Sequence, residues 1–146
     1  MIIYTHYNLD LDAASSAALA KIIYPESEVV FISADTIKEK FFSIHNKKEE
    51  YLILDIDCEG IGLKGEHKVV SGKTYVLSAF SLLLGQHFDL IDVFQDISDE
   101  INKVDSGIEE STSMLPLIFN SFKKSSKNDY ELLEIWEKFF NGLYTL

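Results

Sequence analysis

The segment Tyr51–Asp57, which reads Tyr-Leu-Ile-Leu-Asp-Ile-Asp, is the feature that most narrows the folds available to this chain. A short, continuous apolar run that ends in acidic residues is typical of a strand buried on both faces of a parallel sheet. Two further β-prone runs, Met1–Tyr4 and Glu28–Ser33, precede it, and helix-forming segments lie between them. We therefore predict an α/β fold, with a mainly parallel sheet covered by helices and a C-terminal helical extension.

Helices are predicted along most of the remaining chain, because apolar residues recur there at helical spacing. Residues 1–108 are expected to form the α/β domain, and residues 109–146 a helical extension packed on the same core. The segment Ser71–Gly85 is expected to open with a polar cap and to continue as a helix. The other helical segments are Asp12–Tyr24, Ala34–Asn46 (a short helix or a loop), Phe88–Val104, Glu109–Lys124 and Asp129–Leu146.

Composition limits the classes of partner. The formal net charge of −11 disfavours binding to long nucleic acid, which relies on lysine and arginine along the phosphates. Cys58 is the only cysteine, which excludes an intramolecular disulfide and favours a reducing cytoplasm. The chain has no apolar run of about 18 residues and no basic start followed by an apolar stretch. We therefore expect neither a membrane span nor a secretion signal.

Polar side chains alternate directly after the first predicted strand. His6, Asp10 and Asp12 lie at even spacing, so an extended backbone would point them to one side and would point Leu9 and Leu11 into the protein. Imidazole and carboxylate ligands this close together suit a divalent cation such as Mn²⁺, Zn²⁺ or Fe²⁺. The alternative is an ordinary polar loop in which Asp12 caps the following helix.

Matching residues recur downstream. Asp55 follows the strongest predicted strand, so it reaches the same carboxyl edge of the sheet as the first motif, where ligands of open α/β sheets bind. His67 lies in the glycine-containing segment that follows, and Asp105 lies at the end of a predicted amphipathic helix. Brought together without cations, these carboxylates would repel one another and would be costly to desolvate.

Together these motifs resemble those of the DHH phosphoesterase family. Thr5–Ala13 (Thr-His-Tyr-Asn-Leu-Asp-Leu-Asp-Ala) matches the family's first motif, Leu52–Asp55 resembles its second, and Lys103–Gly107 resembles its fourth. The family includes manganese-dependent pyrophosphatases, single-strand exonucleases, and enzymes that degrade short oligonucleotides or cyclic dinucleotides. The resemblance covers residues 1–108 and implies a phosphohydrolase that cleaves a phosphodiester or phosphoanhydride in a small phosphorylated substrate.

The resemblance also implies two divalent cations, with Mn²⁺ expected and Asp55 bridging them. Two cations about 4 Å apart would acidify a shared water and hold both oxygens of an in-line phosphoryl displacement. The implied ligands are His6, Asp10 and Asp55 for one cation, and Asp12, Asp55, His67 and Asp105 for the other.

One motif departs from the family pattern, because Glu66-His67-Lys68 stands where Asp-His-His is expected. His67 would remain a metal ligand, whereas Lys68 replaces the histidine that faces the substrate's phosphate. A lysine binds phosphate as a point charge but does not titrate near neutrality. The catalytic residues that the resemblance implies are Asp55, Lys68 and Asn8, which would hold the leaving oxygen or orient a ligand.

The family's second domain, which grips the substrate, has no counterpart in this sequence. The C-terminal helices or a second subunit would then cover the cleft, so a homo-oligomer is left open. The alternative function is a catalytically degenerate relative that binds or sequesters a nucleotide without hydrolysing it. Lys64, Lys68 and Lys73 are either phosphate-neutralising residues or solvated surface lysines.

Two other classes are disfavoured. Asp55-x-Asp57 after an apolar strand also resembles the nucleophile motif of haloacid-dehalogenase-like phosphatases, but Glu59 stands where threonine or valine is expected, and His6 and Asp10 are left without a role. A receiver-like phosphoacceptor would need an acidic pair immediately after the first strand, which this chain does not clearly have.

Overall fold

The computed structural model describes residues 1–46, 50–56, 62–64, 66–70, 73–106 and 114–145. Its elements in chain order are β1 (Ile2–Thr5), α1 (Leu11–Ile23), β2 (Glu28–Phe31), α2 (Ala34–Asn46), β3 (Tyr51–Ile53), β4 (Glu66–Val70), β5 (Lys73–Leu77), α3 (Ala79–Leu84), α4 (Phe88–Ser106), α5 (Leu115–Ser125) and α6 (Asp129–Thr145).

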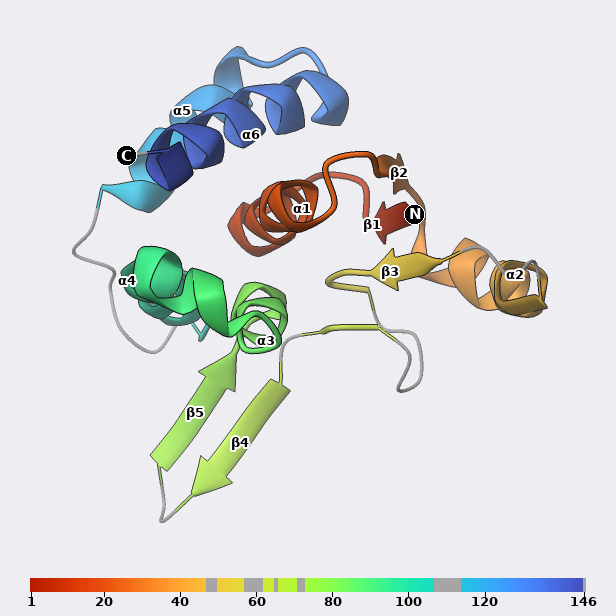
Figure 1. The fold of residues 1–146 in the computed structure, drawn as a ribbon, viewed down its shortest axis with the longest axis horizontal. Coiled ribbons are helices and arrows are strands. Elements are labelled where there is room, and N and C mark those ends of the chain that lie inside the picture. Colours follow the sequence, from red (N-terminus) through yellow and green to blue (C-terminus); the bar gives the residue numbers. More distant parts are fainter. Residues whose placement is uncertain (47–49, 57–61, 65, 71–72, 107–113, 146) are drawn as a thin grey trace.

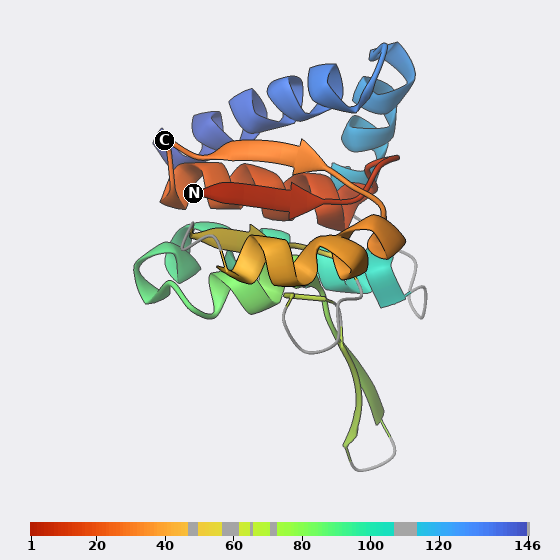
Figure 2. The same ribbon diagram turned by 90° about the vertical axis from the view of Figure 1, so that its right-hand side faces the viewer.

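A parallel sheet of strand order β2-β1-β3 lies at the centre of the molecule. Ile2 of β1 pairs with Glu28 of β2 and with Tyr51 of β3, so the three strands end at the same edge. α1 lies on one face of the sheet and α2 on the other (Figures 1 and 2). This arrangement confirms the predicted α/β fold with a parallel sheet, covering helices and a helical C-terminal region.

The main hydrophobic core surrounds α1. Every residue from Leu11 to Ala20 is buried, because the helix lies between the sheet, α3 and α6. Alanines on its early turns let its backbone come close to these neighbours. Trp136 of α6 is fully buried and donates its Nε1–H to Ser15 Oγ at 3.0 Å. The C-terminal helices therefore share the core of the α/β part.

A smaller cluster lies on the opposite face, beneath α2. Ile32, Ile37, Ile53 and Ile56 are buried there together, and Tyr4 packs against them. The odd and even residues of β1 thus serve different cores, as the alternation of side chains along a strand requires. Both faces of the sheet are apolar, which leaves the polar chemistry of these strands to their carboxyl ends.

The conformation of residues 73–77 differs from the prediction made from the sequence. Lys73–Leu77, expected to be helical, forms strand β5, which pairs antiparallel with β4. The helix begins only at Ala79, where Ser78 is the N-cap and accepts the Ser81 N–H. The pairing partner explains the difference, because Glu66–Val70 offers β5 a complete ladder. The β4–β5 hairpin extends away from the sheet and helices (Figures 1 and 2).

Strand β3 is shorter than predicted: it ends at Ile53, whereas the predicted strand ran to Asp57. Leu54 still forms a parallel bridge with Leu63, and its N–H donates to Tyr4 O at 2.9 Å. The backbone then turns at Asp55, whose φ of 56° lies in the left-handed region that residues other than glycine rarely adopt. Asp57, a candidate in one disfavoured alternative, lies outside the described residues.

Candidate metal centre

Strand register brings His6 and Asp55 together. Tyr4 of β1 pairs with Ile53 of β3, and the next residues of both strands continue toward the same edge. His6 and Asp55 each lie two residues after this pair, and His6 Nε2 lies 3.1 Å from Asp55 Oδ2. The sequence prediction that this pair meets at the carboxyl edge follows directly from the parallel pairing.

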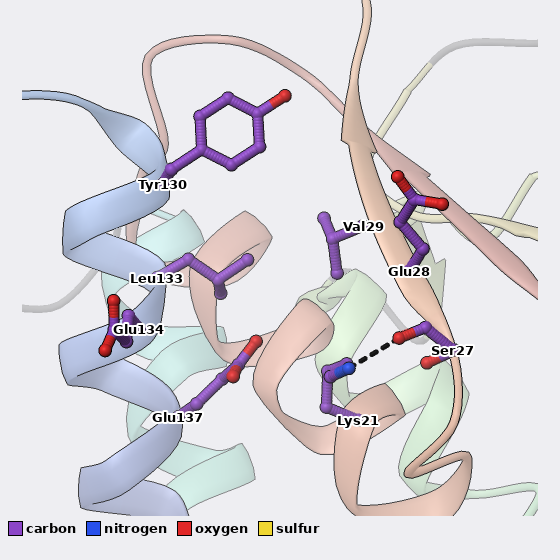
Figure 3. Close-up of a pocket in the computed structure, with 8 residues that line it drawn as sticks. All are labelled: Lys21, Ser27, Glu28, Val29, Tyr130, Leu133, Glu134 and Glu137. Carbon is purple, nitrogen blue, oxygen red and sulfur yellow. Dashed lines mark hydrogen bonds between the residues drawn. The ribbon is translucent and has the colours of Figure 1, made fainter.

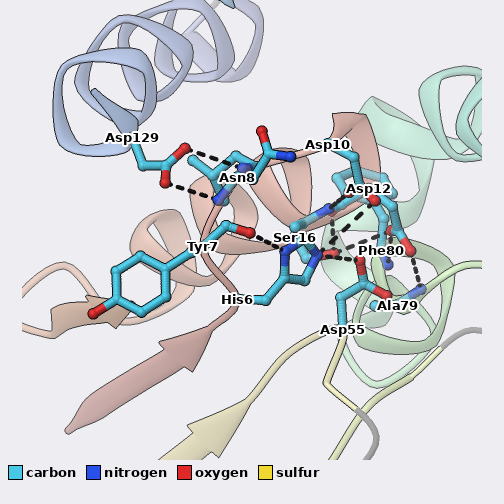
Figure 4. Close-up of polar contacts among 12 residues, drawn as sticks. His6, Tyr7, Asn8, Asp10, Asp12, Ser16, Asp55, Ala79, Phe80 and Asp129 are labelled. Atoms are coloured by element: carbon cyan, nitrogen blue, oxygen red, sulfur yellow. Dashed lines mark hydrogen bonds and ion pairs between the residues drawn. The ribbon is translucent and has the colours of Figure 1, made fainter. Parts of the chain in front are cut away.

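Asp10 joins this pair while capping α1. Its Oδ1 accepts the Ala13 N–H at 2.8 Å, and its Oδ2 lies 3.9 Å from His6 Nε2 (Figure 4). The N-cap of α1 is therefore Asp10, so the alternative interpretation that Asp12 is the cap is wrong. One oxygen of Asp10 holds the helix end, and the other remains directed toward His6. Burial raises the pKa of Asp10, and the charge of Asp55 raises it further.

The orientation of His6 suits it to ligate a cation through Nε2. Its Nδ1–H donates to Tyr7 O at 2.8 Å, which turns Nε2 toward the two carboxylates. A backbone carbonyl on the far nitrogen is a common way of fixing a metal-binding histidine. The hydrogen bond to Asp55 raises the pKa of His6 to about 9, although burial opposes the shift.

The separations of the two carboxylates from His6 fit a small divalent cation. Ligand atoms of His6, Asp10 and Asp55 all lie within 4.8 Å of one another. Two ligand atoms each about 2.1 Å from a cation are at most about 4.2 Å apart. The two separations involving His6, 3.1 and 3.9 Å, fall inside this limit without any movement.

Asp12 lies deeper, in the first turn of α1 rather than on an extended loop. It is 3% exposed, and its Oδ2 and Oδ1 accept the N–H groups of Ala79 and Phe80, each at 2.9 Å (Figure 4). The carboxylate therefore sits at the N-terminal end of α3, where backbone N–H groups favour an anion. Burial nevertheless raises the pKa of Asp12 to about 7, with the charges of Asp55 and Asp105 adding to the shift.

Asp105 lies beside Asp10 and Asp12. The three carboxylates, together with apolar side chains of α1 and α4, line a cavity of about 170 Å³. The charge of Asp55 raises the pKa of both Asp10 and Asp12, so Asp55 lies near both carboxylates. Four of the predicted ligands besides His6 thus gather in one region, around the carboxyl ends of β1 and β3.

The remaining predicted residues are less fully described. His67 and Lys68 lie on β4 and Lys73 on β5, where the backbone but not the side chains is described. Glu66 pairs with Leu77, two residues before Ala79, whose N–H binds Asp12. The hairpin therefore starts and ends close to the carboxylate cluster, and the roles of His67 and Lys68 stay predictions.

The C-terminal helices bind the loop between His6 and Asp10, a contact that no pattern in the sequence indicates. Asp129, the first residue of α6, accepts the N–H groups of Asn8 and Leu9 at 2.9 and 3.0 Å (Figure 4). Lys123 of α5 donates to Leu9 O at 2.7 Å. Asn8 itself is exposed and has a φ of 58°, a left-handed conformation that asparagine tolerates.

Neither protein-family models, nor curated proteins, nor solved structures include a match to this chain. Within the described ranges, every helix is too short or too polar to cross a membrane.

Proposed function

We propose that this protein is a metal-dependent phosphohydrolase that cleaves a phosphodiester or phosphoanhydride in a small phosphorylated substrate. The observation that carries the proposal is the convergence of His6 Nε2 with carboxylate oxygens of Asp10 and Asp55, at the sheet edge where ligands of α/β folds bind. The resemblance of the motifs around these residues to DHH phosphoesterases supports the same reaction class. We place the protein in the cytoplasm, which suits its single cysteine.

The donor set suits the metal that we propose. One imidazole and several carboxylates favour Mn²⁺, Fe²⁺ or Zn²⁺, and we propose two Mn²⁺ ions. His6, Asp10 and Asp55 would hold the first. Asp12, Asp55 and Asp105 would contribute to the second, together with His67.

Each side chain would then have a distinct task. Bound cations would supply an acidified water and would offset charge on the phosphate. Asp55 would contribute a ligand to both cation sites, because its charge acts on Asp10 of the first set and on Asp12 of the second. Asp10 and Asp12 would remain in place during turnover, because helix ends bind their carboxylates. Asn8 and Lys68 would contact the substrate's oxygens.

Hydrolysis of a small panel tests this proposal: pyrophosphate, oligonucleotides of two to five residues, cyclic dinucleotides and adenosine phosphates, with and without Mn²⁺. We expect Mn²⁺-dependent release of phosphate or mononucleotide, and a loss of more than about 100-fold in Asp55→Asn, because removing a ligand costs at least as much as removing its supporting contacts. Asp96→Asn, an exposed aspartate on α4, is the matched control. Turnover that persists in Asp55→Asn would overturn the assignment.

A second candidate function is nucleotide binding without hydrolysis. The observation that favours it is the engagement of Asp12, whose two oxygens already accept N–H groups from the start of α3. A protein with one well-formed cation site and Lys68 in place of a histidine could retain a phosphate without cleaving it. Retained binding of adenosine 5′-monophosphate, with Mn²⁺ bound but no turnover on any panel member, would identify this function.

A further inference from the structure

Three aromatic rings gather beside the candidate metal centre. Phe31, at the end of β2, is buried, and its ring lies 4.6 Å from that of Tyr130 and 6.3 Å from that of Tyr7. The two tyrosines are 60% and 61% exposed, so much of each ring remains open to solvent. We call these three residues the aromatic cluster.

The aromatic cluster lies at the same sheet edge as the proposed ligands, one strand away. Phe31 pairs with Thr5, the residue directly before His6, and Tyr7 directly follows His6. Tyr7 lies on the opposite side of His6 from Asp55 (Figure 4). Neighbouring strands are about 4.8 Å apart, so the end of β2 that carries Phe31 lies one strand spacing from the end of β1 that carries His6.

The aromatic cluster is also held in place by the contacts that fix the metal-binding loop. The carbonyl of Tyr7 accepts the His6 Nδ1–H, so the backbone of Tyr7 is tied to a proposed ligand. Asp129, the neighbour of Tyr130, binds the N–H groups of Asn8 and Leu9. The backbone of Tyr7 and the neighbour of Tyr130 are therefore both held by hydrogen bonds to the metal-binding loop, which lowers the entropic cost of binding a flat ring.

The negative charge of the pocket next to Tyr130 disfavours a second phosphate group of the substrate at this position. A pocket of about 440 Å³ opens there between α1, β2 and α6, with Glu28, Glu134 and Glu137 among its lining residues (Figure 3). Its lysine, Lys21, donates to Ser27 O at 2.5 Å rather than facing open space. A phosphate in this direction would meet mainly carboxylates, whereas a neutral base would meet no such repulsion.

We propose that Tyr7 and Tyr130 form a stacking surface for the base of a nucleotide whose phosphate is bound at the candidate metal centre. The inference rests on the proposed function and narrows its substrate class from small phosphorylated compounds to nucleotides and short oligonucleotides. Aromatic rings stack on any base, so the surface favours a base over none without choosing among bases. The acidic pocket limits the chain on this side to one nucleoside.

Two probes that differ only in the base test the proposal: adenosine 5′-monophosphate and ribose 5-phosphate. In the presence of Mn²⁺, we expect the wild-type protein to bind the nucleotide about tenfold more tightly, since stacking on one aromatic side chain supports a difference of this size. Tyr7→Ala and Tyr130→Ala are expected to weaken binding of the nucleotide but not of ribose 5-phosphate. Tyr7→Phe keeps the ring and is expected to retain the preference.

Tyr144→Ala is the matched control, because Tyr144 is 48% exposed and stacks on Phe94 at the far end of α6. Equal affinity of the wild-type protein for the two probes, or a preference unchanged in both alanine variants, would overturn the stacking surface. Titration of the protein with Mn²⁺ alone measures separately whether the candidate metal centre binds the cation. If Mn²⁺ does not bind, the proposed function fails, and the ratio of the two affinities without Mn²⁺ still decides the stacking surface.

Discussion

At the scale of single residues, Asp129 joins the C-terminal helices to the loop that carries the proposed ligands. Its two oxygens accept the N–H groups of Asn8 and Leu9, and an asparagine in its place would offer only one acceptor oxygen. A hydrogen bond to a charged group contributes about 1.5–3 kcal/mol. We expect Asp129→Asn to lower the free energy of unfolding by about 1–2 kcal/mol and the affinity for Mn²⁺ several-fold, measured by denaturant unfolding and by calorimetry.

Asp35→Asn is the control for this change. Asp35 is exposed in the first turn of α2, so the variant removes a charge from a helix N-terminus without touching the loop. A fall in stability with an unchanged affinity for Mn²⁺ in Asp129→Asn would show that the contact supports the fold and does not position the ligands.

At the scale of elements, the packing of α6 on α1 sustains this arrangement. Trp136 is fully buried, contacts the rings of Phe119 and Phe139, and binds Ser15 through its indole N–H. We expect Trp136→Ala to lower the free energy of unfolding by about 3–5 kcal/mol, measured by urea denaturation, because the cavity cannot be refilled. Leu117→Ala, on the 63% exposed side chain of Leu117, should change it by less than about 0.5 kcal/mol. Equal losses in the two variants would contradict the packing.

The same scale shows which parts of the structure were predictable. The positions of β1, β2 and the long helices could be predicted from local sequence, because a short apolar run indicates a strand and apolar residues at helical spacing indicate a helix. β5 was not predictable in this way. Leu77, Phe80 and Leu84 lie at helical spacing, which predicted a helix that included Leu77, whereas pairing with β4 makes Lys73–Leu77 a strand. Strand conformation depends on a partner, and the sequence does not display the partner.

Some contacts of the candidate site were also predictable from the sequence, and others were not. His6 and Asp55 were expected to meet, because parallel register requires it, and the structure places them together. The double role of Asp10 depends on where α1 starts, and that boundary differs from the predicted one by one residue. The contact of Asp129 spans 120 and 121 residues of sequence, and no local pattern indicates it.

At the scale of the whole molecule, we expect the concentration of negative charge at one sheet edge to make stability depend on pH and on metal. The chain carries a formal charge of −11, and the proposed ligands bring carboxylates together around His6. His6 has a raised pKa, about 9 against 6.5, so protonated His6 stabilises the folded state. That contribution is fully present below pH 6.5 and is lost as the pH rises through about 9.

We therefore expect the metal-free protein to lose on the order of 2 kcal/mol of its free energy of unfolding between pH 6.5 and 9.5. With saturating Mn²⁺ the trend should reverse over the lower part of this range, because binding through Nε2 requires His6 to release its proton. Urea denaturation at a series of pH values, with chelator or with Mn²⁺, measures both slopes. His6→Asn should remove the metal-free slope above about pH 8, whereas Asp12, whose pKa is raised to about 7, still contributes a slope below that pH. A slope that this variant keeps above about pH 8 would assign the pH dependence to other groups, and a slope that Mn²⁺ leaves unchanged would contradict cation binding at His6.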